Sequence, residues 1–301
     1  MAVAAPRAAE SRRARRNARA GSGGPRYPGW LALPAVFWYL LFFLGPLAIM
    51  ASYSFGELSG YADVKFVWNL ENYRYLFDGT LYTDVFKRTF VMASIGTLAT
   101  LAIGFPFAYY LARYAKHKTL LLLLVIVPFW TSFLIRTYSF LIILDPEFPV
   151  ARALRPLGFP ASYELLYTQK AIYIGVVYNY LPLMVLPLYA ALERMDWSLV
   201  DAAQDLGDSA FRAFRRVTLP LVLPGVLAGS LLVFIPLTGE YLIPEILGGG
   251  KTLFAGNLIA QQFLEARDWP FGSAIAMVVI AALTIALLVY ARAVGRQEQY
   301  G

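Results

Sequence analysis

The 301-residue sequence contains no cysteine and a single histidine, His117. The absence of cysteine excludes disulfide bonds, thiolate metal sites and thiol catalysis. One histidine alone excludes a metal site built on paired histidines, including the HExxH arrangement. The residues on which common metal- and thiol-dependent enzymes rely are therefore missing, and we expect no metal site.

Charge is also scarce. Only 15% of the residues are charged, whereas 59% belong to the set AVILMFWYC; a typical soluble protein has about 25% charged residues. A compact soluble domain of this length could not bury so much apolar surface. Disorder over most of the chain would need low hydrophobicity and high charge. The composition therefore indicates an integral membrane protein.

Six apolar runs are long enough to cross a bilayer as helices, which takes about 20 mostly apolar residues. They are Leu31–Phe55, Thr89–Arg113, Leu120–Leu144, Ala171–Leu192, Leu221–Leu247 and Phe271–Ala291. Transmembrane β-strands would instead give weak alternating segments of about ten residues. We therefore expect an all-α polytopic membrane protein with six transmembrane helices.

The lysines and arginines are unevenly distributed between the two sides of this arrangement. Of the 26, sixteen lie in the termini and in the second and fourth loops, nine lie in the other loops, and Arg136 lies inside the third span. By the positive-inside rule both termini are cytoplasmic. The net charge of +7 is then mainly an orientation signal, and we expect no nucleic-acid partner.

Residues 1–29 form a separate region, rich in Arg, Ala, Gly, Ser and Pro. We expect a disordered basic cytoplasmic tail, attracted to anionic membrane lipid, followed by a membrane domain over residues 30–301. The pairs Arg12-Arg13 and Arg15-Arg16 raise a twin-arginine or Sec signal as an alternative. The apolar run from Leu31 is longer than a cleaved h-region of about 7–15 residues, which favours an uncleaved first helix.

The fourth loop, about Glu193–Leu219, is longer than a connection requires and carries charges of both signs. Apolar residues recur in it at helical spacing. The first stripe comprises Trp197, Val200, Ala203 and Leu206, and the second comprises Phe211, Phe214 and Val217. We predict two short amphipathic helices joined at Gly207, the second closed by Pro220. Such helices need a partner surface, whether lipid, the bundle itself or another protein.

The same loop resembles a known family. Asp201-Ala202-Ala203, three residues, Gly207, nine residues, Val217, one residue and Leu219-Pro220 match the spacing of the EAA loop of ABC importer permeases. That pattern has Glu in place of Asp201 and Ile in place of Val217. The resemblance implies the type I importer permease fold, with this loop acting as a coupling helix that sits in a groove of a cytoplasmic ATPase.

Three further stretches, residues 128–138, 181–189 and 239–249, resemble the spermidine/putrescine branch of that family, in particular its first permease subunit. This implies the translocation path of an ATP-driven importer in the bacterial inner membrane, with a polyamine as substrate. The implied partners are an ABC ATPase dimer, a second homologous permease and an extracytoplasmic solute-binding protein. ATP and Mg would be bound by the ATPase, with no cofactor in this chain.

Two other functions remain open. Permeases for opines and amino-acid-like solutes share such stretches. A self-contained secondary transporter is also conceivable, although it would usually contain more buried carboxylates and would have no use for the loop. The segment Glu245–Thr252 ends like a P-loop, with Gly250-Lys251-Thr252. Its first glycine is replaced by Glu245 and it follows an apolar run rather than a strand, which argues against a nucleotide site.

Charges inside membrane spans are costly and suggest function. Arg136 and Glu240 lie about 24 Å and 30 Å along the third and fifth spans at 1.5 Å per residue, so both fall in the outer half. Arg136 could pair with Glu240 or reach toward Asp145. Alternatively, Glu240 faces the path and attracts a cationic amine, and Glu240→Gln would then lower polyamine uptake. Aromatic residues can also hold an amine by cation–π contacts. The candidates are Tyr138, Tyr178, Tyr180, Tyr241 and Trp130, each of which ordinary helix packing or an interfacial position would also explain.

Overall fold

The structure is a computed structural model. It describes the whole chain except residues 1–29, 31–32, 61–62, 150–151, 153–164 and 298–301. The predicted basic tail, residues 1–29, lies outside the described residues. The chain divides into two units, Met1–Met50 and Ala51–Gly301.

The first predicted span is helical. It consists of α2 (Leu33–Tyr39), the π-helical turn η2 (Leu40–Leu44) and α3 (Gly45–Tyr53), which continues into the second unit. The wide turn ends just before Pro46, which has no N–H to donate to the preceding turn. Gly45 N–H accordingly bonds the carbonyl of Leu40. The continuous stretch Leu33–Tyr53 has 21 residues and the hydropathy of a membrane span.

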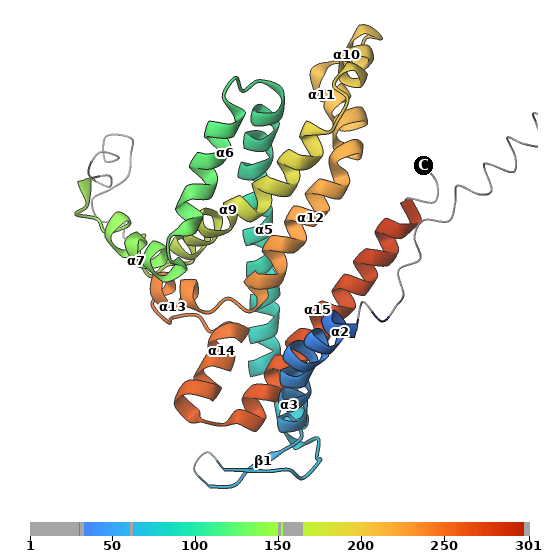
Figure 1. The fold of residues 1–301 in the computed structure, drawn as a ribbon. Helices are drawn as coiled ribbons and strands as arrows, with labels where there is room; N and C mark the ends of the chain where they lie inside the picture. The colour runs from blue at the N-terminus through green and yellow to red at the C-terminus, as the bar shows by residue number, and fades with distance from the viewer. Residues whose placement is uncertain (1–29, 31–32, 61–62, 150–151, 153–164, 298–301) are drawn as a thin grey trace, which may run out of the picture. The chain divides into compact units, whose positions relative to one another are not determined.

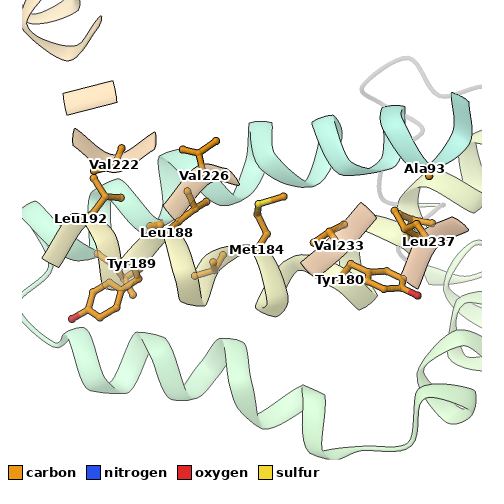
Figure 2. Packing of buried hydrophobic residues seen from close by; sticks show 14 of the residues in the cluster. Ala93, Tyr180, Met184, Leu188, Tyr189, Leu192, Val222, Val226, Val233 and Leu237 are labelled. Carbon is orange, nitrogen blue, oxygen red and sulfur yellow. The ribbon is translucent and has the colours of Figure 1, made fainter. Parts of the chain in front are cut away.

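The core of the second unit is formed by three helices that lie side by side (Figure 1): α5 (Leu81–Arg113), α9 (Gln169–Glu193) and α12 (Leu219–Thr238). Small residues bring the backbones together, as is usual between membrane helices. A Cβ at Gly225 of α12 would lie 2.4 Å from the Cβ of Ala191 on α9, so any larger residue would push the helices apart. Met184 and Leu188 of α9 fill the interface and are fully buried (Figure 2).

The predicted third span is broken. It contains α6 (Lys118–Ile126), the 3-10 turn η3 (Val127–Trp130) and α7 (Phe133–Ile143), and the two arms meet at 97°. The prediction of one continuous helix is therefore wrong. Pro128 removes a backbone donor, and Thr131 and Ser132 have extended ψ angles of 154° and 134°, so the chain turns there. The depth inferred for Arg136 along a straight helix does not apply.

The predicted fifth span also ends early. Helix α12 stops at Thr238, and a new helix, α13 (Leu242–Gly248), begins after Gly239–Tyr241. We call these three residues the α12–α13 break. Pro244 lies in the first turn of α13, where a helix does not need its N–H. The prediction of a single helix from Leu221 to Leu247 is therefore wrong, as is the 30 Å depth assigned to Glu240.

The segments predicted as external loops contain short elements. They are β1 (Glu57–Leu58), β2 (Val64–Lys65), α4 (Glu71–Phe77), α14 (Ala255–Gln261) and the π turn η6 (Gln262–Ala266). The two strands are antiparallel, with Glu57 opposite Lys65. A second apolar cluster joins α4, α5 and α14 to the last helix, α15 (Trp269–Gln297). Helix α5 itself begins at Leu81, earlier than predicted. Its first turn is closed by the Thr83 hydroxyl and the Asp84 N–H, which both donate to the Thr80 carbonyl.

Within the described residues, five helices are long and apolar enough to cross a membrane, and a sixth span results if the bent pair α6–α7 counts as one. The all-α, six-span architecture is therefore confirmed, with two spans that are not single helices. Gly250-Lys251-Thr252 follows helix α13 rather than a strand, in keeping with the reading that it is no P-loop.

Candidate functional site

The 193–219 loop contains the two predicted helices, α10 (Ser198–Asp205) and α11 (Ala210–Ala213), joined at Gly207. Gly207 has φ +95°, a left-handed conformation that favours glycine. Asp196 Oδ1 accepts a 3.0 Å hydrogen bond from Ser198 N–H. Bonds from the Ser198 side chain and backbone lower the pKa of Asp196. Ser209 Oγ accepts from Arg212 N–H at 3.4 Å and caps α11.

Pro220 does not close the second helix, contrary to prediction. Helix α11 continues through the π turn η5 (Phe214–Thr218) into α12, and Ala210–Thr238 is one span of 29 residues. The wide turn lies immediately before Pro220, whose missing N–H leaves one carbonyl of the preceding turn without its helical donor. The loop is therefore joined to the core by an uninterrupted helix.

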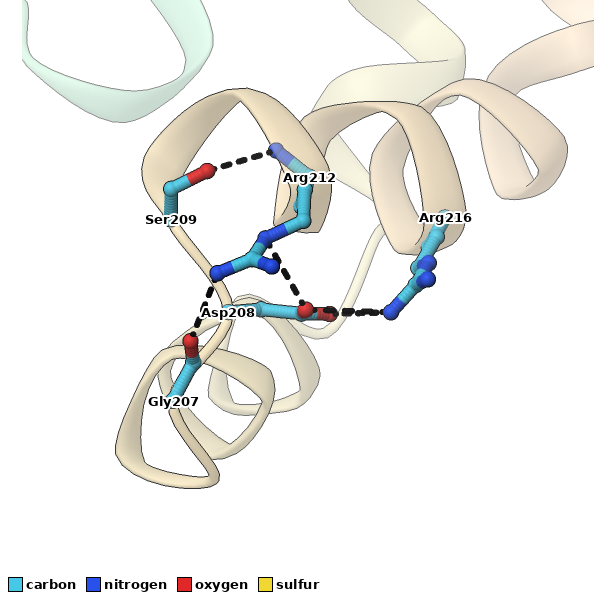
Figure 3. A network of polar contacts seen from close by, with 5 residues as sticks. All are labelled: Gly207, Asp208, Ser209, Arg212 and Arg216. Carbon is cyan, nitrogen blue, oxygen red and sulfur yellow. Dashed lines mark hydrogen bonds and ion pairs between the residues drawn. The ribbon is translucent and has the colours of Figure 1, made fainter.

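A polar network fixes the turn at Gly207 (Figure 3). Asp208 Oδ1 lies 3.0 Å from Arg216 Nη1 and 3.5 Å from Arg212 Nε. Arg212 Nη2 also donates to the Gly207 carbonyl at 3.0 Å. Both arginines are largely exposed, so these contacts shape the loop without adding much stability.

A second contact holds α10 to the end of α5. Arg113 Nη2 donates to Asp201 Oδ1 at 2.8 Å, and its guanidinium lies 4.9 Å from the Trp197 ring centroid. Trp197 in turn packs edge-on against Tyr109 of α5. Arg113 thus fixes Asp201, the first residue of the EAA-like motif, on the helix bundle.

The remaining motif residues are distributed over both sides of the loop. Ala202, Gly207 and Pro220 are exposed, whereas Ala203, Val217 and Leu219 are half-buried. Two large apolar residues flank Gly207 and point into solvent: Leu206 is 91% exposed and Phe211 is 72% exposed. This apolar tip, Leu206 and Phe211, has no counterpart to cover it among the described residues.

At the opposite end of α12, the α12–α13 break is organised by Glu240. This residue is 8% exposed. Its Oε2 accepts a 2.6 Å hydrogen bond from the Tyr180 hydroxyl of α9, and Oε1 accepts from the N–H groups of Leu242 and Ile243 at 2.9 and 3.2 Å. The carboxylate therefore caps α13 and ties it to α9.

Helix α14 packs against the break. A Cβ at Gly256 would lie 2.6 Å from the Gly239 carbonyl oxygen, so only glycine fits. Ala255 N–H donates to Thr89 Oγ1 of α5 at 2.8 Å. The buried amide of Asn257 donates to the Tyr241 carbonyl at 3.0 Å and to Glu245 Oε2 at 2.9 Å. Helices α5, α9, α13 and α14 thus meet where the fifth span is interrupted.

Arg136 does not join this network. Among the described residues it forms no ion pair with Glu240 or Asp145. Its guanidinium lies 4.9 Å from the Phe129 ring centroid, and its buried Nε has no described hydrogen-bond partner. Trp130 and Tyr138 are exposed, and none of the described ring contacts connects them to Tyr241.

Three contributing residues are not predicted by the sequence. The sequence marks Arg113 only as a positive charge at the end of a predicted span and Thr89 only as the start of that span. Asn257 lay in a segment read as an external loop, although the pair Gly256-Asn257 amid apolar residues is a weak sign of close packing. No signal in the sequence joins Asn257 to Glu245.

Comparison with known proteins identifies the family. A family model described as "Binding-protein-dependent transport system inner membrane component" matches residues 89–297. The spermidine/putrescine transport system permease protein PotB of Escherichia coli is 42% identical over 260 residues, covering 86% of this chain and 94% of that protein. The inner membrane ABC transporter permease protein YdcU of the same organism is 30% identical over 295 residues, covering 87% and 94%.

Solved structures agree in fold. A chain from a bacterial ABC transporter involved in the import of the acidic polysaccharide alginate superposes with a TM-score of 0.66 at 16% identity, covering 87% of this chain and 93% of that one. A chain from a bacterial alginate ABC transporter in complex with an alginate pentasaccharide-bound periplasmic protein gives 0.66 at 15% identity, covering 86% of this chain and 90% of that one. The chain is a multi-pass membrane protein and belongs to the family of inner membrane permease components of binding-protein-dependent ABC importers.

Proposed function

We propose that this chain is the permease subunit of an ATP-driven polyamine importer, with spermidine or putrescine as cargo. The observation that carries the proposal is the 42% identity, over 86% of the chain, to a permease named for those two amines. The negative charge of Glu240 inside a membrane span supports a cationic rather than an anionic cargo.

The 193–219 loop is the coupling element in this proposal. Its apolar tip, Leu206 and Phe211, would insert into a groove of a cytoplasmic ATPase dimer, while Arg113 and Asp201 hold α10 in place. ATP and Mg would be bound by that dimer, and this chain would contribute no cofactor site. Both termini would then be cytoplasmic, as the distribution of lysine and arginine predicts.

The translocation path would pass the α12–α13 break. Glu240 and Tyr241 lie in the break itself, and α7, which carries Arg136 and Tyr138, packs against α13. Trp130 precedes α7 at the turn of the bent span. A second, homologous permease would supply the other half of the path, and an extracytoplasmic solute-binding protein would deliver the amine.

Transport of another small solute, such as an opine or an amino-acid-like compound, is the second candidate, because related permeases share the same stretches. A self-contained secondary transporter is disfavoured by the membership in a binding-protein-dependent family and by the exposed tip of the 193–219 loop, which such a carrier would not need.

The test is reconstitution of this chain with its ATPase, second permease and binding protein in proteoliposomes. We expect ATP-dependent uptake of radiolabelled spermidine or putrescine that requires the binding protein. Uptake of an opine or amino acid without uptake of either polyamine would contradict the proposal for the substrate. Uptake by this chain without the ATPase would contradict the proposal for the mechanism.

A further inference from the structure

The exposed face of α13 differs in chemistry from the exposed faces of the spans. On α5 the exposed residues include Val91, Ile95 and Leu98, as contact with lipid requires. On α13 the exposed residue is Glu245, and Tyr241 is exposed just before it in the α12–α13 break. A carboxylate on a lipid-facing surface is costly, so this face is suited to water or to a polar ligand rather than to lipid.

Tyr241 and Glu245 lie one helical turn apart. Glu245 N–H donates to the Tyr241 carbonyl at 3.0 Å, and residues separated by four positions share a helix face. The Asn257 amide of α14 donates to that same carbonyl and to Glu245 Oε2. Because Asn257 is buried and uses both amide protons, it holds the Glu245 carboxylate in one orientation.

The other carboxylate oxygen has no such donor. The described donor at this carboxylate, Asn257, bonds Oε2, and none of the hydrogen bonds of the described residues goes to Oε1. It faces Gly250, where a Cβ would lie 3.4 Å from it, so the missing side chain at Gly250 leaves space beside the oxygen. Glu240 differs in this respect, because both of its oxygens already accept hydrogen bonds.

We propose that Tyr241 and Glu245 bind an ammonium group of the cargo at the α12–α13 break, with Asn257 as a positioning residue. Glu245 Oε1 supplies the negative charge and the hydrogen-bond acceptor, and the 44% exposed Tyr241 supplies a ring face for a cation–π contact. The proposal rests on the proposed function, since it assigns a site to the amine that the importer carries.

The test uses the complete transporter in proteoliposomes with a saturating concentration of spermidine-loaded binding protein, so that capture by the binding protein does not limit the rate. Glu245→Gln keeps the shape and removes the charge, and we expect spermidine uptake to fall about tenfold. The matched control is Glu265→Gln, the same change at an exposed acid of η6, and it should transport at the wild-type rate. Wild-type uptake by Glu245→Gln overturns the proposal.

Asn257 is tested through its coupling to Glu245. We expect Asn257→Ala to lower uptake by a larger factor in the wild-type background than in the Glu245→Gln background, because its contact with the carboxylate matters only while that charge is present, whereas its lost bond to the Tyr241 carbonyl acts in both. A purely structural residue would lower uptake by the same factor in both backgrounds, and that result would overturn the positioning role. Tyr241→Phe should retain uptake and Tyr241→Leu should reduce it, since only the ring is used.

The two proposals fail in different ways. A wild-type transporter that takes up no polyamine overturns the proposed function. A wild-type transporter that takes up spermidine, with an equally active Glu245→Gln variant, overturns only the amine site. Recovery of each variant as an intact complex in size-exclusion chromatography separates lost binding from lost assembly.

Discussion

The two ends of α12 are both organised by carboxylates, but in opposite environments. Before α12, Asp201 and Asp208 pair with arginines at an exposed surface. After α12, Glu240 and Glu245 accept hydrogen bonds from Tyr180 and Asn257, which are buried. Exposed ion pairs contribute about 0–1 kcal/mol each, whereas an unpaired buried polar group costs about 1–3 kcal/mol.

The two ends of α12 should therefore respond differently to mutation. Loss of a contact at the α12–α13 break should first damage the fold, because buried donors would remain without acceptors. Loss of a contact in the 193–219 loop should leave the fold intact and change what the loop can bind. Variants of Glu240, Gly207, Arg113 and Asp196, in decreasing order of expected effect, test whether the two ends of α12 differ in this way.

Glu240→Ala should destabilise the permease by roughly 2–5 kcal/mol, because the Tyr180 hydroxyl and two backbone N–H groups of α13 lose their acceptor. Thermal unfolding of the detergent-solubilised complex measures the effect. Glu240→Gln is the control, since its amide oxygen can still accept from the two backbone N–H groups and its amide nitrogen can donate to the Tyr180 hydroxyl oxygen. It should assemble normally while polyamine uptake falls with the lost charge. An alanine variant that melts with the wild type would show that the break does not depend on this cap.

Gly207→Val should lower the melting temperature only slightly but weaken coupling clearly. The φ of +95° would cost a β-branched residue about 1–2 kcal/mol. That cost lowers the population of the present turn conformation roughly five- to thirtyfold. Nothing lies within 4 Å of a Cβ at this position, so the strain is in the backbone alone. Co-purification with the ATPase should therefore fall for valine and be retained for Gly207→Asn. Equal retention by both variants would contradict a role for the turn.

Arg113→Ala should lower the stability of the fold by about 1 kcal/mol or less, because its partner Asp201 is mostly exposed. The substitution nevertheless removes the contact that holds α10 to the end of α5. We expect less spermidine transported per ATP hydrolysed in proteoliposomes. The exchanged pair Arg113→Asp with Asp201→Arg should recover part of that ratio. If the single variant keeps the wild-type ratio, the contact is only a surface ion pair.

The smallest effect is expected at Asp196, which is fully exposed. Its pKa is lowered by the hydrogen bonds from Ser198, so its contribution is present above the ordinary carboxyl pKa and disappears as the pH falls through the lower folded value. The melting temperatures of wild type and Asp196→Ala should differ slightly at neutral pH and converge below about pH 4. A difference that persists unchanged at acid pH would assign it to another cause.

The sequence predicts the features that depend on local pattern. The spans around α9 and α15 follow from apolar length, and the turn at Gly207 follows from two helical stripes with a glycine between them. These signals are local because membrane spans must satisfy their own backbone hydrogen bonds.

The breaks in the third and fifth spans could not be located from the sequence, because proline alone does not mark them. Pro106 lies inside the continuous α5, and Pro182 lies inside the continuous α9. At the α12–α13 break the deciding contact is between Glu240 and Tyr180, which is 60 residues distant in the chain. Likewise, the partner of Asn257 is a carboxylate on a separate helix. Such pairs are defined by tertiary packing and are invisible to a search for periodicity.

The unbroken helix Ala210–Thr238 has a mechanical consequence. At 1.5 Å per residue its 29 residues form a rod about 43 Å long, with the apolar tip at one end and Glu240 just beyond the other. A rigid tilt of about 5° about one end of a rod of that length displaces the other end by about 4 Å. A displacement of the apolar tip would therefore be transmitted to the α12–α13 break, and the wide turn at Phe214–Thr218 is one site where the helix can bend.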